Sequence, residues 1–100
     1  MEGEMIRHIV MINFKTEIGE RERDEFCKKS AETLTQIPGT HNVFIGKAAE
    51  MGKARYGFSL FIDFDDEATL KTYVDHPLHQ GVRAKLVSMI TDSFVSDYRY

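Results

Sequence analysis

The sequence predicts a single domain of the α+β class, and three observations lead to that prediction. Four short segments read as β-strands, most clearly residues 56–64 with their alternation of apolar and polar side chains, and helical patterns occur among them. The chain has 100 residues, which suits one domain and is too short for two. Apolar residues make up 42% of it and charged residues 29%, an ordinary balance for a globular protein. We therefore expect one domain over residues 1–100, with its core over about 5–100.

The expected strands cover residues 6–15, 41–47, 56–64 and 93–100. Alternation in the first strand puts five side chains on one face: Ile6, His8, Val10, Ile12 and Phe14. The third strand has the clearest pattern, with one apolar face made of Phe58, Leu60, Ile62 and Phe64. In the last strand, one face carries Phe94, Ser96, Tyr98 and Tyr100.

Three helices are expected, at residues 19–36, 67–75 and 77 to about 90. The turn residues Ile37-Pro38-Gly39 stop the first helix. Asp65 and Asp66 are natural N-caps for the second, and Pro77 breaks that helix and opens the third. The order strand, helix, strand, strand, helix pair, strand predicts a ferredoxin-like βαββαβ fold with an antiparallel four-stranded sheet.

One face of this sheet is expected to lack helices, yet it carries apolar and aromatic residues. They are Ile9, Met11, Phe61, Phe94, Tyr98 and Tyr100. Covering six such side chains gains on the order of 10 kcal/mol, against an association cost of roughly 4–15 kcal/mol. An apolar face of this size is typical of an interface. We therefore expect a homodimer that buries Ile9, Met11, Phe61, Phe94 and Tyr98, and the alternative is a monomer with an apolar sheet.

Charge and cysteine content narrow the classes of partner. The net charge is −3 and the basic residues are scattered, which argues against a nucleic-acid surface. No apolar run is long enough for a membrane span, so we expect no membrane partner. Cys27 is the one cysteine, which excludes a disulfide within the chain and favours a reducing compartment, and we expect a cytoplasmic protein. On the apolar face of its helix, Cys27 is expected to be an inert thiol.

Seven short segments, in this order, resemble the stress-responsive α/β-barrel (Dabb) domain family. They are Ile6-Arg7-His8-Ile9-Val10, Ile37-Pro38-Gly39, Gly46-Lys47, Tyr56-Gly57-Phe58, Phe64-Asp65-Asp66, Tyr73-Val74-Asp75-His76-Pro77-Leu78-His79 and Asp97-Tyr98. The resemblance runs from about Met5 to Tyr100 and implies a dimeric α+β barrel. Most members of this family have no assigned activity. A plant member is a cofactor-free polyketide cyclase, and its catalytic tyrosine and histidine match Tyr73 and His79, while a histidine on its first strand matches His8. Ser30 and Ile90 stand where that enzyme has large aromatic residues.

The residues themselves also make Tyr73, His79 and His8 the candidate catalytic group. His79 lies in the first turn of its helix on the apolar stripe, where a neutral imidazole could act as a general base. Tyr73 could donate a hydrogen bond to a substrate carbonyl. His8 lies between apolar neighbours and needs a partner, which could be a ligand, Tyr73 or water. The structural alternative is that His79 and Tyr73 are core residues with local hydrogen bonds.

A ligand pocket is expected between the sheet and the helices. Its lining would include Val10, Ile12, Phe26, Ser30, Leu60, Val82, Ile90 and Val95. We expect no metal and no cofactor, since His76 is expected to cap a helix, His41 to be exposed, and Asp65 and Asp66 are explained by capping.

Three functions are consistent with these residues. The first is the binding of a small apolar or carbonyl-containing molecule without catalysis. The second is a cofactor-free cyclase or lyase that uses Tyr73 and His79. The third, which comes from related dimeric barrels, is a monooxygenase, some members of which carry haem.

Overall fold

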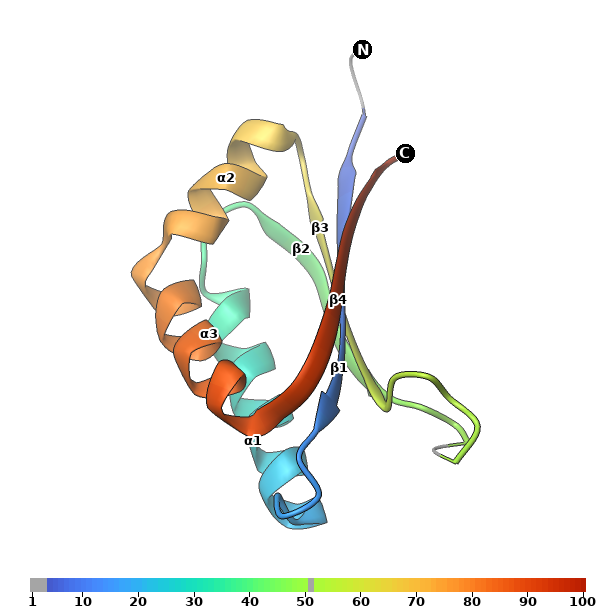
Figure 1. Cartoon of the computed structure of the whole chain (residues 1–100). Coiled ribbons are helices and arrows are strands. Elements are labelled where there is room, and N and C mark those ends of the chain that lie inside the picture. The colour runs from blue at the N-terminus through green and yellow to red at the C-terminus, as the bar shows by residue number, and fades with distance from the viewer. Residues whose placement is uncertain (1–3, 51) are drawn as a thin grey trace.

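The computed structural model describes residues 4–50 and 52–100, and it shows a four-stranded antiparallel sheet with three helices. Along the chain these are β1 (Ile6–Phe14), α1 (Glu20–Thr35), β2 (Thr40–Lys47), β3 (Phe58–Phe64), α2 (Glu67–Asp75), α3 (Pro77–Met89) and β4 (Ile90–Arg99). The strand order across the sheet is β2-β3-β1-β4. All helices cover the same side of the sheet, and the other side is bare (Figure 1). The predicted ferredoxin-like fold is confirmed.

The helix starts follow the expected capping chemistry. Asp66 accepts a hydrogen bond from the Thr69 amide at 2.8 Å and so caps α2. Nδ1 of His76 accepts one from the Leu78 amide at 3.1 Å and caps α3, whose first residue is Pro77. The predictions for Asp66, His76 and Pro77 are confirmed.

The start of β4 differs from the prediction. Ile90 was expected to end the stripe of α3, but its backbone is extended, with φ −113° and ψ 156°, and it begins the strand. The amide of Lys15 donates to the Met89 carbonyl at 2.9 Å, and Ile90 lies opposite Phe14 in the ladder. Pairing with the end of β1 therefore takes the chain directly from helix to strand.

The helix-side face of the sheet forms the core. The register places Ile6 opposite Phe64, His8 opposite Ile62 and Ile12 opposite Phe58, so the expected faces of β1 and β3 meet. Two buried clusters lie along this face. One contains Ile6, Leu34, Ile37, Ile62, Phe64 and Tyr73, and the other contains Ile12, Phe14, Phe58 and Met89.

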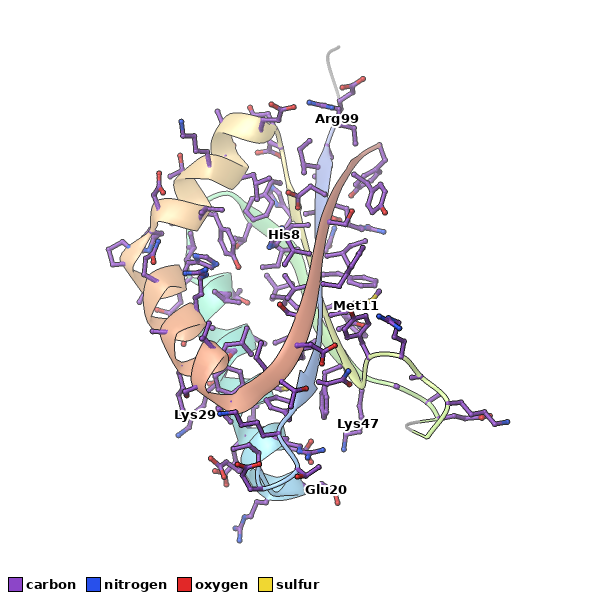
Figure 2. All side chains as sticks on the ribbon, in the orientation of Figure 1. His8, Met11, Glu20, Lys29, Lys47 and Arg99 are labelled. Atoms are coloured by element: carbon purple, nitrogen blue, oxygen red, sulfur yellow. The ribbon has the colours of Figure 1, made fainter. Side chains whose placement is uncertain are left out.

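The bare side, which we call the outer face, carries the apolar side chains expected there. Ile9, Met11 and Phe61 are half-buried, while Phe94 and Tyr98 are 46% and 56% exposed. Met11 points away from the helices and His8 points toward them (Figure 2). Phe44, which was not predicted here, joins this face because β2 places it opposite Phe61, with ring centroids 5.9 Å apart.

The outer face also holds a buried carboxylate. Asp63 is 1% exposed and accepts four hydrogen bonds, two from Arg7 at 2.8 and 3.0 Å, one from Tyr100 at 2.6 Å and one from Asn42 at 3.0 Å. Hydrogen bonds from Arg7, Tyr100 and Asn42 hold the pKa of this carboxyl well below its usual range, against the effect of burial. The network joins β1, β2, β3 and the end of the chain.

Among residues 4–50 and 52–100, none of the helices has the length and apolar character needed to cross a membrane.

Candidate active site

The three candidate catalytic residues line one cavity of about 270 Å³ between the sheet and the helices α2 and α3. His8 comes from β1, Tyr73 from α2 and His79 from α3. Five residues predicted for the pocket also line this cavity: Val10, Leu60, Val82, Ile90 and Val95. The cavity lies just below the size range of pockets for drug-sized ligands, so its ligand would be small.

The other three predicted pocket residues lie elsewhere. Ile12, Phe26 and Ser30 line a separate void of about 50 Å³ between α1 and the sheet, whose surface is almost entirely apolar. Ile12 belongs to the second core cluster, and Phe26 packs against that cluster. The space under the helices is therefore divided into two parts, and only one of them contacts His8, Tyr73 and His79.

One ring nitrogen of His79 makes a hydrogen bond to the backbone, and the other does not. Nδ1 lies 2.9 Å from the Val74 carbonyl oxygen, so the proton is on Nδ1 and this nitrogen donates. Nε2 then carries a lone pair. Burial lowers the pKa of His79 below its ordinary value; the Val74 bond opposes this, and His8 and Arg83 add to it. The imidazole is therefore neutral at neutral pH, as a general base must be.

Tyr73 is 1% exposed and contacts the other two members of the group. Its ring centroid lies 4.5 Å from that of His79 and 5.8 Å from that of His8. Burial raises the pKa of Tyr73, so its hydroxyl stays protonated and acts as a hydrogen-bond donor. Among the described residues, every side-chain nitrogen or oxygen that is buried from solvent has a hydrogen-bond partner. Since no protein group within that part of the chain hydrogen-bonds this hydroxyl, it must touch the open space of the cavity.

His8 is held by a residue that sequence reasoning did not identify. Its Nδ1 lies 2.6 Å from Oδ1 of Asp97, which sits directly opposite His8 in the β1–β4 ladder. The expected partners were a ligand, Tyr73 or water. The signal for Asp97 was the alternation of β4, which puts Phe94, Ser96 and Tyr98 on the outer face and therefore Asp97 on the helix side. A carboxylate at Nδ1 fixes the tautomer of the ring.

Other reactive side chains are accounted for by their surroundings. Cys27 is half-buried, and burial, together with Asp24, raises its pKa to about 11, which makes the thiol unreactive at neutral pH. His41 is exposed, as expected, and lies 3.1 Å from Asp65. Within the described part of the chain, His, Cys, Asp and Glu side chains do not gather in groups of three or more that could hold a metal ion.

Comparison with known proteins places the chain among relatives of the same fold. Olivetolic acid cyclase of Cannabis sativa is 28% identical over 78 residues, which cover 76% of this chain and 77% of the cyclase. The crystal structure of a Dabb family protein with a ferredoxin-like fold from Mesorhizobium loti is 28% identical, with a TM-score of 0.83 over 95% of each chain. A dimeric ferredoxin-like protein of unknown function from Jannaschia sp. CCS1 is 25% identical, with a TM-score of 0.76 over 94% of this chain and 97% of that one.

The family whose pattern matches is described as the Stress responsive A/B Barrel Domain, and the match covers residues 6–100. That range begins at the first residue of β1 and runs through β4, so it includes every strand and helix described above. The chain belongs to the stress-responsive A/B barrel (Dabb) domain family.

Proposed function

We propose that this protein is a homodimer whose cavity binds a small, mostly apolar carbonyl compound, and that Tyr73 and His79 transfer protons on it without a cofactor. The observation that carries this proposal is the pairing of opposite roles at one cavity. Burial keeps Tyr73 protonated and keeps His79 neutral, and their rings lie 4.5 Å apart. A hydrogen-bond donor next to a base is the arrangement that enolisation requires.

The chemistry follows from these two groups. Nε2 of His79 takes a proton from the carbon next to the carbonyl, and the C–H electron pair moves into a C=C bond as the carbonyl oxygen gains negative charge. The Tyr73 hydroxyl donates a hydrogen bond to that oxygen. If the enolate carbon attacks a second carbonyl of the same molecule, a C–C bond forms and the new alkoxide takes the proton back from His79. The step needs no oxidant or reductant. His8, oriented by Asp97, adds a second polar contact to the ligand.

The relatives support this proposal at two points. The name of the Cannabis sativa relative describes a cyclase, which is a reaction of the class described above. The protein from Jannaschia sp. is described as dimeric, in agreement with the apolar outer face found here. The helices leave that face uncovered (Figure 1), and a second copy would bury Ile9, Met11, Phe61, Phe94 and Tyr98.

A second candidate is ligand binding without catalysis. The hydrogen bond from His79 to the Val74 carbonyl favours it, because the same bond would serve a purely structural histidine at the junction of α2 and α3. Measuring α-proton exchange of a small ketone in D₂O by NMR separates the two functions. Catalysis predicts exchange above the buffer rate, whereas binding alone predicts ligand line broadening with exchange at the buffer rate.

A further inference from the structure

Arg83 brings a permanent positive charge to the wall of the candidate active site. The cavity of about 270 Å³ is lined by apolar side chains, by Tyr73, His8 and His79, and by Arg83, while its described wall includes no Asp or Glu. Arg83 and Val87 line the cavity and are nevertheless exposed, so they mark the place where it opens to solvent. A ligand in the cavity therefore meets a guanidinium at the opening.

The surroundings of Arg83 do not neutralise this charge. Its helix, α3, contains no acidic residue, and within the described part of the chain Arg83 forms no salt bridge. Asp97 is the carboxylate that the site does hold, but its Oδ1 lies 2.6 Å from His8, and its side chain lines a different cleft between α2 and β4. A planar guanidinium with free donors is suited to bind a carboxylate through two parallel hydrogen bonds.

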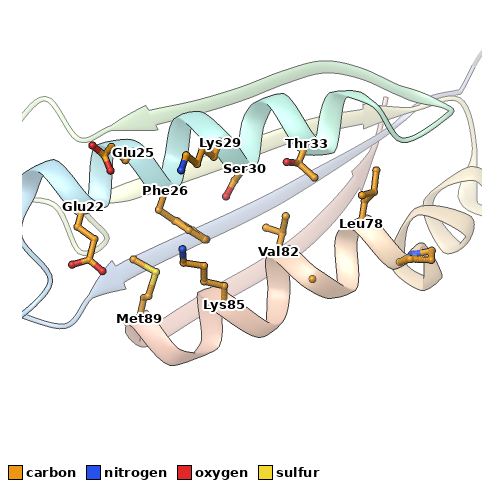
Figure 3. Close-up of a pocket in the computed structure, with 12 residues that line it drawn as sticks. Glu22, Glu25, Phe26, Lys29, Ser30, Thr33, Leu78, Val82, Lys85 and Met89 are labelled. Carbon is orange, nitrogen blue, oxygen red and sulfur yellow. The ribbon is translucent and has the colours of Figure 1, made fainter.

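The groove between α1 and α3 shows the opposite arrangement. Lys29 and Lys85 line it together with Glu22 and Glu25 (Figure 3). Two cations and two carboxylates leave no net charge there. Lys85, two residues after Arg83 on the same helix, therefore shares its surroundings with acidic side chains, whereas the wall around Arg83 is apolar or neutral.

The charge of Arg83 also acts on the proposed base. His79 and Arg83 are one turn apart on α3, which places them on the same face of the helix. Burial is the main cause that lowers the pKa of His79, and His8 and Arg83 lower it further, against the hydrogen bond to Val74. In the proposed reaction His79 holds the abstracted proton, and a nearby cation makes that protonated state less stable. An anion paired with Arg83 offsets this repulsion.

From this arrangement we propose that the ligand is a short keto acid. Its carboxylate pairs with the Arg83 guanidinium at the opening, its carbonyl lies between Tyr73 and His79, and apolar residues of the wall such as Val82 contact the carbons between them. A carboxylate is too costly to bury without partners, and the exposed position of Arg83 lets it stay partly hydrated. The inference rests on the proposed function for the carbonyl end, whereas the carboxylate end depends on Arg83 alone.

The test compares levulinate, a straight-chain keto acid, with levulinamide, which has the same shape and no charge. Binding is measured by NMR titration of the full chain at low ionic strength, and the methyl signals of Val82 and Val87, which line the cavity, report whether the ligand enters it. Arg83→Met removes the charge and keeps a long unbranched side chain with good helix propensity. The matched control is Lys85→Met, which removes the same charge from α3 at a position that lines the groove and not the cavity.

We expect Arg83→Met to bind levulinate about five- to tenfold more weakly, between the effect of an exposed ion pair and that of a hydrogen bond to a charged group. Levulinamide should stay within twofold, and Lys85→Met should bind both compounds like the unaltered chain. Arg83→Lys should lose only about two- to threefold, because it keeps the charge without the planar fork. Raising the salt to about 0.5 M should reduce the advantage of levulinate over levulinamide. Circular dichroism checks that each variant is folded.

Several results would overturn the inference. They are levulinate that shifts neither valine signal, levulinate that binds no better than levulinamide, an equal loss of both compounds in Arg83→Met, and an equal loss of levulinate in Lys85→Met. The proposed function fails separately, if no ketone exchanges its α-protons above the buffer rate. Binding that depends on Arg83 without such exchange would support the carboxylate site and contradict catalysis. Exchange of levulinamide that depends on Tyr73, with no effect of Arg83 on levulinate, would do the reverse.

Discussion

Asp63→Asn is expected to destabilise the protein substantially, because it changes a buried carboxylate that organises a hydrogen-bond network. Asp63 is 1% exposed and accepts four hydrogen bonds from Arg7, Tyr100 and Asn42. An asparagine loses the charge and turns an NH₂ group toward these donors. Hydrogen bonds to a charged group contribute roughly 1.5–3 kcal/mol each, and breaking a buried ion pair costs about 3–5 kcal/mol. The Arg7 side chain is 43% exposed and can be rehydrated, which reduces the loss. We therefore expect a loss of about 2–4 kcal/mol.

Urea unfolding at one fixed protomer concentration measures this loss, and in thermal unfolding it corresponds to a Tm drop of roughly 10–20 °C. Asp65→Asn is the matched control, because this exposed carboxylate two residues later should change stability by less than about 0.5 kcal/mol. The hydrogen bonds depress the pKa of Asp63 below its ordinary value of 3.8. Its contribution is therefore complete above that pH and is lost as the pH falls toward the folded-state pKa. An Asp63→Asn protein within about 0.5 kcal/mol of the unaltered chain at neutral pH would refute this reasoning.

Three further predictions concern a helix, the outer face and pH. Gly81→Ala should raise the free energy of unfolding by about 0.5–1 kcal/mol, because a Cβ there meets open space and alanine favours the helix; an unchanged urea midpoint would contradict this. Phe61→Asp, which places a charge in the proposed interface, should give a monomer by light scattering, while Thr72→Asp on exposed α2 keeps the dimer; a dimeric Phe61→Asp protein would contradict the interface. Burial depresses the pKa of His79 below 6.5, so the unfolded chain takes up the proton first and stability should fall as the pH drops below that value. His79→Asn should weaken this pH dependence in urea unfolding, and an equally steep dependence would contradict it.

The fold was predictable because its signals are local. The alternation in β1 and β3, the cap at Asp66 and the helix start at Pro77 are each encoded within a few residues, and the structure agrees with all of them. The first residues of β4 were missed because Thr91 and Asp92 are both polar and both exposed on an edge strand. Neither side of the strand is buried there, so the sequence shows no alternation of apolar and polar residues.

The candidate site was less predictable because its details depend on pairings between distant residues. The pattern of its strand placed His8 on the helix side of the sheet, and the pattern of its helix placed Tyr73 toward the core. The contact of His8 with Asp97 joins residues 89 positions apart and depends on the register of β4. Phe26 and Ser30 were assigned to one pocket with His79, and the structure divides that space because Leu34 and Leu86 lie at the boundary of both parts.

Proton transfer by Tyr73 and His79 is tested by the rate of α-proton exchange of a small ketone in D₂O, compared among the unaltered chain, Tyr73→Phe, His79→Ala and the double variant. General acid–base catalysis typically contributes roughly 10²–10⁴-fold, so we expect each single variant to lose at least tenfold of the rate. The double variant should lose little more, because two groups that act as a unit are not additive. Binding of the ketone, followed by titration, should persist in Tyr73→Phe. Full exchange rates in both single variants would contradict the assignment of Tyr73 as donor and His79 as base.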